Sequence, residues 1–145
     1  MPESLDLLAA RLISQGSHFA RVASRTAGRH RPVVAFRVLA DLDLEGPQRV
    51  GRLASHERLS QPAMTATINR LEADGLVHRT VDPADGRAVV VAITPDGRTE
   101  LASFRSRAAA NVRPGLELLR PEDLRTLAHA ADLLERLAGQ AQPSA

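Results

Sequence analysis

The sequence contains no cysteine, no lysine, no tryptophan and no tyrosine. The absence of cysteine excludes a disulfide, a thiolate metal site and an oxidation-sensing thiol, and it leaves the redox compartment undefined. Phe, Trp and Tyr together make up only 2% of the residues. So few aromatic rings make stacking on unpaired bases a poor prospect, and any nucleic-acid partner is expected to be a duplex.

Long apolar runs and catalytic motifs are also missing. No segment is long and apolar enough to suggest a membrane span, and no signal-peptide pattern is present. No two of the five histidines lie four residues apart, and the adjacent His56-Glu57 is too weak a pattern to indicate a metal site. No phosphate loop, nucleophile elbow or clustered acid pair occurs. We therefore expect a cytoplasmic protein that is not an enzyme and has no cofactor, metal or membrane partner.

Arginine alone carries the positive charge. The 19 basic residues face 17 acidic ones, which gives a formal net charge of +2, and residues 31–98 hold nine of each sign. Any affinity for DNA would therefore depend on where the arginines lie, since a guanidinium suits bidentate contacts to guanine and phosphate. The densest basic run is Arg25, Arg29, His30 and Arg31, which is expected either to contact a DNA backbone or to be solvated.

The pattern along residues 50–98 is the most informative part of the chain. A short apolar helix is predicted at residues 50–55, a second helix at 61–73, and two strands at 76–81 and 88–93. Helix, turn, helix and two-stranded ribbon form a winged helix-turn-helix, which places a helix in the major groove. With 145 residues and 43% hydrophobic residues, we expect a single compact domain that is mainly α with a small β-hairpin wing.

The second helix carries clear start and stop signals. Ser60 is a favoured N-cap, and Pro62 lies in the first turn, where a missing N–H costs little. Gly75 is expected just past the end, because glycine readily adopts the left-handed conformation that closes a helix. Met64, Ile68 and Leu71 recur at the spacing of a buried stripe.

The remaining face of this helix is predicted to contact DNA. Its polar side chains match base edges and phosphates, although a solvated polar face is the alternative reading. The predicted DNA-binding residues of this helix are Ser60, Gln61, Pro62, Ala63, Thr65, Ala66, Asn69 and Arg70.

The wing adds two further DNA-binding candidates. Asp82-Pro83 and Asp85-Gly86 are turn formers, and Asp-Gly is a strong hairpin signal. Arg87 then lies near the tip, where it would reach a minor groove or a phosphate. Asp85 is expected to accept hydrogen bonds from an arginine or from loop amides and so to hold the wing rigid. The alternative is an exposed hairpin tip with two unremarkable charges.

Four linked motifs in this region resemble those of the MarR family of bacterial transcriptional regulators. They are, in chain order, Ser60-Gln61-Pro62, the run Leu71 to Arg79 (LEADGLVHR), Asp82 with Asp85 and Arg87, and Thr94-Pro95-Asp96-Gly97. The resemblance covers roughly residues 32–105 closely. Many members carry Arg at the position of Ala66, so that in this chain Gln61, Thr65, Asn69 and Arg70 are expected to carry more of the base readout.

The resemblance implies a sequence-specific, dimeric regulator that binds double-stranded DNA, with residues 32–98 as the DNA-binding region. Residues 1–31 and 99–145 are expected to form a helical dimerisation region, because their apolar stripes have nothing obvious to cover them within one subunit. They contain a helix at 4–28, another from Pro95 towards Val112 that Pro114-Gly115 should kink or end, and a last one from Pro121. The alternative is that the terminal helices pack on their own subunit.

A homodimer would separate two recognition helices by about 34 Å and so predict a palindromic operator. We expect a repressor that is released by a small aromatic or anionic effector, as the family resemblance implies. His18, Arg21, Phe36 and Arg37 are the predicted ligand-binding residues, and the site is hypothesised to be weak. For His18 the alternative to ligand binding is that it packs as a residue of the subunit interface. The competing functions are a winged-helix protein-interaction module and a non-specific architectural DNA binder.

Overall fold

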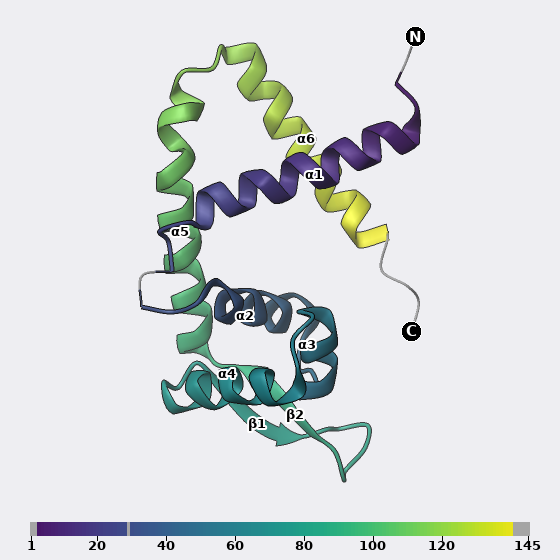
Figure 1. The fold of residues 1–145 in the computed structure, drawn as a ribbon, viewed down its shortest axis with the longest axis vertical. Helices are drawn as coiled ribbons and strands as arrows, with labels where there is room; N and C mark the ends of the chain where they lie inside the picture. Colours follow the sequence, from purple (N-terminus) through teal and green to yellow (C-terminus); the bar gives the residue numbers. More distant parts are fainter. Residues whose placement is uncertain (1–2, 29, 141–145) are drawn as a thin grey trace. The chain divides into compact units, whose positions relative to one another are not determined.

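The computed structural model describes residues 3–28 and 30–140, which divide into two compact units (Figure 1). The first unit, residues 1–111, contains α1 to α4, both strands and most of α5. The second unit, residues 112–145, contains the end of α5 and the whole of α6. No helix within the described ranges is both long and apolar enough to cross a membrane.

Helix α1, Leu5–Ser24, ends earlier than the sequence predicts. Its start is capped by Ser4, whose hydroxyl accepts a hydrogen bond from the Leu7 amide at 3.2 Å. The prediction of a helix to residue 28 was wrong, because the chain turns at residues 25–28 to bury Ala27. The Arg107 guanidinium of α5 donates to the Ala27 carbonyl at 2.7 Å, which stabilises this turn in place of a further helical one.

The core of the first unit lies among α2, Val33–Glu45, α3, Val50–His56, and α4, Gln61–Ala73. All three helices contribute fully buried side chains to one cluster, including Phe36, Leu53 and Met64. The predicted caps of α4 are confirmed, since the Ser60 hydroxyl accepts from the Ala63 amide at 3.3 Å and Gly75 has φ +73°. The predicted buried stripe of Met64, Ile68 and Leu71 is also confirmed.

The wing is a two-stranded antiparallel hairpin of β1, Val77–Val81, and β2, Val89–Ile93. Val77 pairs with Ile93 at one end and Val81 with Val89 at the other. Gln48, in the connection between α2 and α3, adds a bridge to Val91 through two backbone hydrogen bonds of 3.0 and 2.7 Å. The base of the wing is therefore fixed to the helices, while its turn extends beyond them (Figure 1).

Helix α5, Pro95–Glu117, contains Pro114 inside it. Of the two predicted effects of Pro114-Gly115, an end of the helix there is contradicted, because α5 continues to Glu117. Pro114 lies in the last turn, where it removes a single backbone hydrogen bond. In the second unit, α6, Pro121–Gln140, begins where predicted and carries Glu122 and Asp123 in its first turn. None of its residues, all of which are described, is buried. The mainly helical fold with a winged helix-turn-helix is as the sequence predicts.

Candidate nucleic-acid interface

The face of α4 opposite the core is exposed and polar. Seven of the eight residues predicted to bind DNA from this segment are exposed, and Thr65 is half-buried. The exposed ones are Ser60, just before the helix, and Gln61, Pro62, Ala63, Ala66, Asn69 and Arg70 on it. Packing of Met64 and Ile68 against the core fixes the orientation of the helix. The opposite face therefore exposes amide, guanidinium and small side chains to solvent.

The turn between α3 and α4 sets how this face is presented. Leu59 donates its amide to the Ala54 carbonyl at 2.9 Å, and Arg58 adopts a left-handed φ of 54°. A non-glycine residue in that region costs of order 1 kcal/mol and persists only where its surroundings enforce it. Leu53 and Ala54 of α3 are buried against the same core, so α3 holds the start of α4 in a defined position.

Asn69 is held by a neighbour that the sequence did not indicate. Arg79 of β1 pairs with Glu72 of α4 and also donates from Nη2 to Asn69 Oδ1 at 2.8 Å. An asparagine that reads adenine uses its carbonyl oxygen and its amide together. With Oδ1 already accepting from Arg79, the amide of Asn69 is left to donate towards an acceptor such as guanine N7 or O6, or thymine O4.

The turn of the wing is braced by Arg49, which precedes α3. Its Nη2 lies 3.2 Å from Asp82 Oδ2 and 3.5 Å from Asp85 Oδ2. Within the turn, Asp82 accepts from the Ala84 amide at 2.9 Å and Asp85 from the Arg87 amide at 3.1 Å. The expectation that Asp85 accepts hydrogen bonds from an arginine or from loop amides is confirmed for the amide of Arg87. The sequence did not indicate Arg49, which forms an ion pair with Asp85 at 3.5 Å.

These contacts leave Arg87 facing solvent at the wing. Its side chain is exposed and forms no ion pair with any residue of 3–28 or 30–140. The pKa of Asp82 is lowered, chiefly because its carboxylate accepts from the Ala84 amide and secondly because of Arg49. An ionised Asp82 carboxylate retains its contacts with the Ala84 amide and with Arg49. The turn therefore keeps its conformation, and Arg87 keeps its position on the wing.

The basic run at the end of α1 is partly neutralised. Arg31 pairs with Asp74 beyond the end of α4 and lies 3.5 Å from Glu100 of α5. The hydrogen bond with Asp74 raises the pKa of Arg31. This ion pair joins the α1–α2 connection to the end of α4. Arg25 and His30 are exposed. Arg29, which was predicted to belong to the same cluster, lies outside the described residues.

Three of the four predicted ligand-binding residues line one cavity of ≈210 Å³ in the first unit. Arg21, Phe36 and Arg37 lie there with Phe104 and Arg105. Phe36 and Phe104 stack with ring centroids 4.1 Å apart and planes inclined by 10°. His18 is exposed on α1 and is not among the lining residues. The lining therefore combines stacked rings with three arginines, of which Arg37 pairs with Glu57 and Arg105 lies 3.9 Å from Asp43.

Comparisons with known proteins agree with this geometry. A model of the MarR family matches residues 33–89. An HTH-type transcriptional regulator of Mycobacterium tuberculosis is 32% identical over 102 residues, which cover 70% of this chain and 71% of the relative. The residues that the family model matches include α2, α3, α4, β1 and the turn of the wing.

Two solved structures extend the likeness to almost the whole chain. A transcriptional regulator from Pseudomonas aeruginosa is 32% identical with a TM-score of 0.66, and the match covers 94% of this chain and 98% of that one. The transcriptional regulator Tm0710 from Thermotoga maritima is 25% identical with a TM-score of 0.69 and coverage of 93% and 97%.

Proposed function

This chain belongs to the MarR family of transcriptional regulators, and from this membership we propose that it is a dimeric repressor that leaves a palindromic operator when a small ligand binds. The family and these relatives are DNA-binding regulators and not enzymes. The observation that carries the proposal is the exposed polar face of α4 beside a wing whose turn is braced around Arg87.

In this proposal α4 enters the major groove and the wing follows the adjacent backbone. The residues assigned to DNA are those that the sequence predicts, Ser60, Gln61, Pro62, Ala63, Thr65, Ala66, Asn69, Arg70, Asp85 and Arg87. Gln61, Asn69 and Arg70 supply hydrogen bonds to base edges or phosphates, while Ala63 and Ala66 permit close approach. Asp85 acts by holding the wing turn, since its carboxylate is already occupied by Arg49 and the Arg87 amide.

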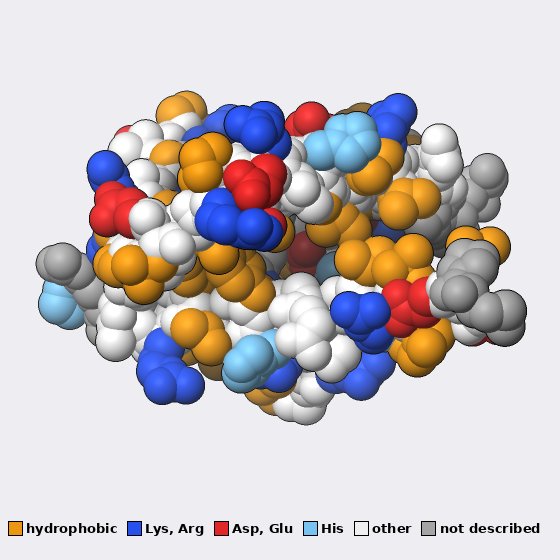
Figure 2. Space-filling model, turned by 90° about the horizontal axis from the view of Figure 1, so that it is seen from above, with side chains coloured by type: hydrophobic (Ala, Val, Ile, Leu, Met, Phe, Trp, Pro, Cys, Tyr) orange, Lys and Arg blue, Asp and Glu red, His pale blue; other side chains and the backbone are white. Residues whose placement is uncertain are grey.

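The dimer is supported by apolar side chains that stay exposed in each unit. On α1 of the first unit, Leu5, Ile13 and Phe19 are 83%, 71% and 54% exposed. On α6 of the second unit, Leu127, Leu134 and Leu137 are about half exposed. Figure 2 shows hydrophobic side chains in several patches among charged ones on the face that it views. Contiguous exposed apolar surface is typical of a protein–protein interface, and twofold pairing with a second copy would cover it.

The effector is proposed to be a small aromatic anion in the cavity beside Phe36 and Phe104. The stacked rings offer an apolar wall, and Arg21 and Arg105 at the lining offer cations for a carboxylate, whereas Arg37 already pairs with Glu57. Residues of α1, α2 and α5 line this cavity. A ligand there would act through its different affinity for the DNA-bound and free arrangements of these helices.

The test is fluorescence anisotropy of the purified protein with a duplex from the promoter region beside its own gene. A scrambled duplex of equal length is titrated alongside at several salt concentrations. Specific binding of two subunits to the promoter duplex is the expected result. Equal, steeply salt-dependent binding to both duplexes would indicate a non-specific architectural binder, and no binding even at low salt would favour a protein-interaction module.

The ligand part of the proposal is tested on the preformed DNA complex. Salicylate is titrated into the complex of the wild type and of Arg105→Gln, whose side chain is 60% exposed and lines the cavity. Release from the wild type and a weaker response of the variant are expected. Failure of millimolar salicylate to release the wild type would contradict an anionic-ligand site here.

A further inference from the structure

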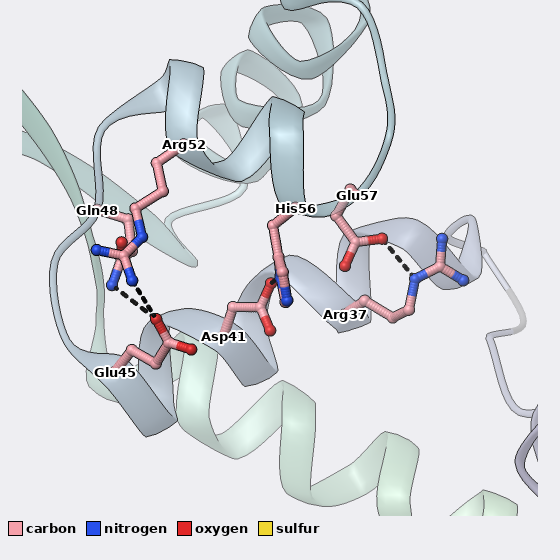
Figure 3. Close-up of polar contacts among 7 residues, drawn as sticks. All are labelled: Arg37, Asp41, Glu45, Gln48, Arg52, His56 and Glu57. Atoms are coloured by element: carbon pink, nitrogen blue, oxygen red, sulfur yellow. Dashed lines mark hydrogen bonds and ion pairs between the residues drawn. The ribbon is translucent and has the colours of Figure 1, made fainter. Parts of the chain in front are cut away.

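Three side chains that commonly bind metals converge where α2 meets the end of α3. They are Asp41 of α2, His56 at the last residue of α3, and Glu57, which caps that helix (Figure 3). One ligand atom from each residue lies within 4.8 Å of those of the other two. The sequence pattern of adjacent His56-Glu57 was too weak to indicate a site, because the third ligand comes from another helix.

We propose that Asp41, His56 and Glu57 bind a divalent transition-metal ion, and that Zn²⁺ is the ion that fits these donors best. One imidazole nitrogen with two carboxylates is a ligand set suited to zinc, and a water would complete four-coordination. Ligand atoms around tetrahedral zinc are about 3.4 Å apart, given bonds of about 2.0–2.2 Å. His56 Nδ1 and Asp41 Oδ2 are now 2.8 Å apart, so this pair needs to open by only about 0.6 Å.

Among the residues drawn in Figure 3, the carboxylates of Asp41, Glu45 and Glu57 outnumber the guanidinium groups of Arg37 and Arg52. Arg37 Nε donates to Glu57 Oε2 at 2.6 Å, and Arg52 Nη2 donates to Glu45 Oε2 at 3.2 Å. Asp41 has His56 as its partner in Figure 3 and no guanidinium beside it. The Asp41 carboxylate faces His56 Nδ1 at 2.8 Å, and a dication held between Asp41, His56 and Glu57 would balance the carboxylate charge there.

An ion can reach the site from solvent, and the buried ligand, Glu57, is already held in place. Two of the three ligands, Asp41 and His56, line a hollow of ≈330 Å³ together with Glu45, Gln48 and Arg52, whereas Glu57 is not among its lining residues. The side chain of His56 is 61% exposed and can turn, whereas that of Glu57 is only 7% exposed. Arg37 fixes the Glu57 carboxylate through Oε2, and a hydrogen bond of this kind orients a metal-binding carboxylate.

An ion bound here would join α2 to the turn that leads into α4. Asp41 belongs to α2, and Glu57 is followed directly by Arg58 and Leu59 of that turn. Because the three ligands come together only in the folded chain, zinc would stabilise the folded state and raise the Tm. This inference does not depend on the proposed repressor function, since it concerns binding of the ion itself.

The experiment measures zinc binding to the full, tag-free chain after treatment with a chelator. Zn²⁺ is titrated in competition with a chromophoric chelator, and the Tm is recorded with and without the ion. We expect one ion per chain for the wild type, and affinity at least about tenfold lower for His56→Gln and for Asp41→Asn. His78→Gln, which removes an exposed histidine of β1, is the matched control and should bind as the wild type does.

Circular dichroism in the presence of chelator establishes that the variants are folded. His56 is largely exposed, so its replacement leaves the core intact and the comparison remains valid. The Tm of the wild type should rise with zinc, and that of His56→Gln should not. Equal zinc affinity of His56→Gln and the wild type would overturn the proposal, as would a wild type that binds no zinc. Millimolar Mg²⁺ should not compete, because it prefers oxygen ligands in an octahedral site.

Discussion

Arg49 Nη2 lies 3.2 Å from Asp82 Oδ2, and this contact joins the residue before α3 to the turn of the wing 33 positions later. Asp82 and Asp85 both face the same guanidinium. The wing has only two strands, and a two-stranded hairpin is marginally stable by itself. Arg49 and the Gln48–Val91 bridge therefore connect the hairpin to the helices that position α4.

Arg49→Gln should weaken binding to the operator without unfolding the protein. The pair is partly exposed, so the free energy of unfolding should fall only slightly. The wing turn loses its brace, and affinity should fall by about three- to tenfold, equal to roughly 0.6–1.4 kcal/mol. Anisotropy and urea denaturation measure the two effects. Arg98→Gln is the control, because Arg98 has the same exposure and pairs with Asp43 instead; an equal loss of affinity in both variants would contradict the bracing role.

The state of Asp82 gives a pH dependence with a defined sign. Its pKa is lowered from the ordinary value of 3.8, so the stabilisation from its contacts is present above that value and is lost as the pH falls through the lower folded-state pKa. In an NMR titration, the Ala84 amide resonance should therefore shift at a pH below 3.8. The midpoint should move upwards in Arg49→Gln. An unchanged midpoint in that variant would show that Arg49 does not act on Asp82.

Arg87→Ala should weaken binding to the operator and to a scrambled duplex by similar factors. A side chain that contacts a phosphate contributes affinity without sequence information. The slope of log affinity against log salt should become shallower by about 0.9 for each wing that contacts DNA. Anisotropy at several salt concentrations measures this slope. Arg125→Ala removes an exposed charge from α6 and, as the control, should leave the slope unchanged. An unchanged slope in Arg87→Ala would show that Arg87 does not contact the DNA.

Phe19→Glu should convert the proposed dimer to a monomer. Phe19 is 54% exposed in the single chain and shares a face of α1 with Leu5 and Leu12 by its seven-residue spacing, and in the proposed dimer a second subunit would cover it. Burying an unpaired carboxylate there costs several kcal/mol. Light scattering after size-exclusion chromatography gives the mass. Leu44→Glu introduces the same charge at a side chain that is 78% exposed on α2, and it should remain dimeric.

Gly97→Ala should destabilise the fold, since a Cβ there would lie 2.1 Å from the Leu76 carbonyl oxygen. Overpacking of this kind costs about 1–3 kcal/mol. Gly115 lies in the same helix, and a Cβ at Gly115 would meet nothing within 4 Å. Gly115→Ala should therefore be stabilising by about 0.4–1 kcal/mol. Urea denaturation of both variants tests the pair, and equal stabilities would show that the close approach of α5 to the Leu76 carbonyl is relaxed in solution.

The sequence by itself determined the elements whose signals are local. The start of α4 follows from the hydroxyl of Ser60 and the ring of Pro62, and its end follows from Gly75, because each acts on backbone groups within a few residues. The turn of the wing follows from Asp82 and Asp85 in the same way. The Thr94-Pro95-Asp96-Gly97 motif indicated the start of α5, although only the structure shows that Gly97 is required by the Leu76 carbonyl.

Only the tertiary structure decided which distant side chains meet. The brace from Arg49 to the wing, the engagement of Asn69 by Arg79, and the stacking of Phe36 on Phe104 all join residues from different elements. The approach of Asp41 to His56 likewise depends on how α2 packs against α3. No periodicity or spacing along the chain specifies these distances, because they follow from the angles at which the helices and the hairpin pack around their shared core.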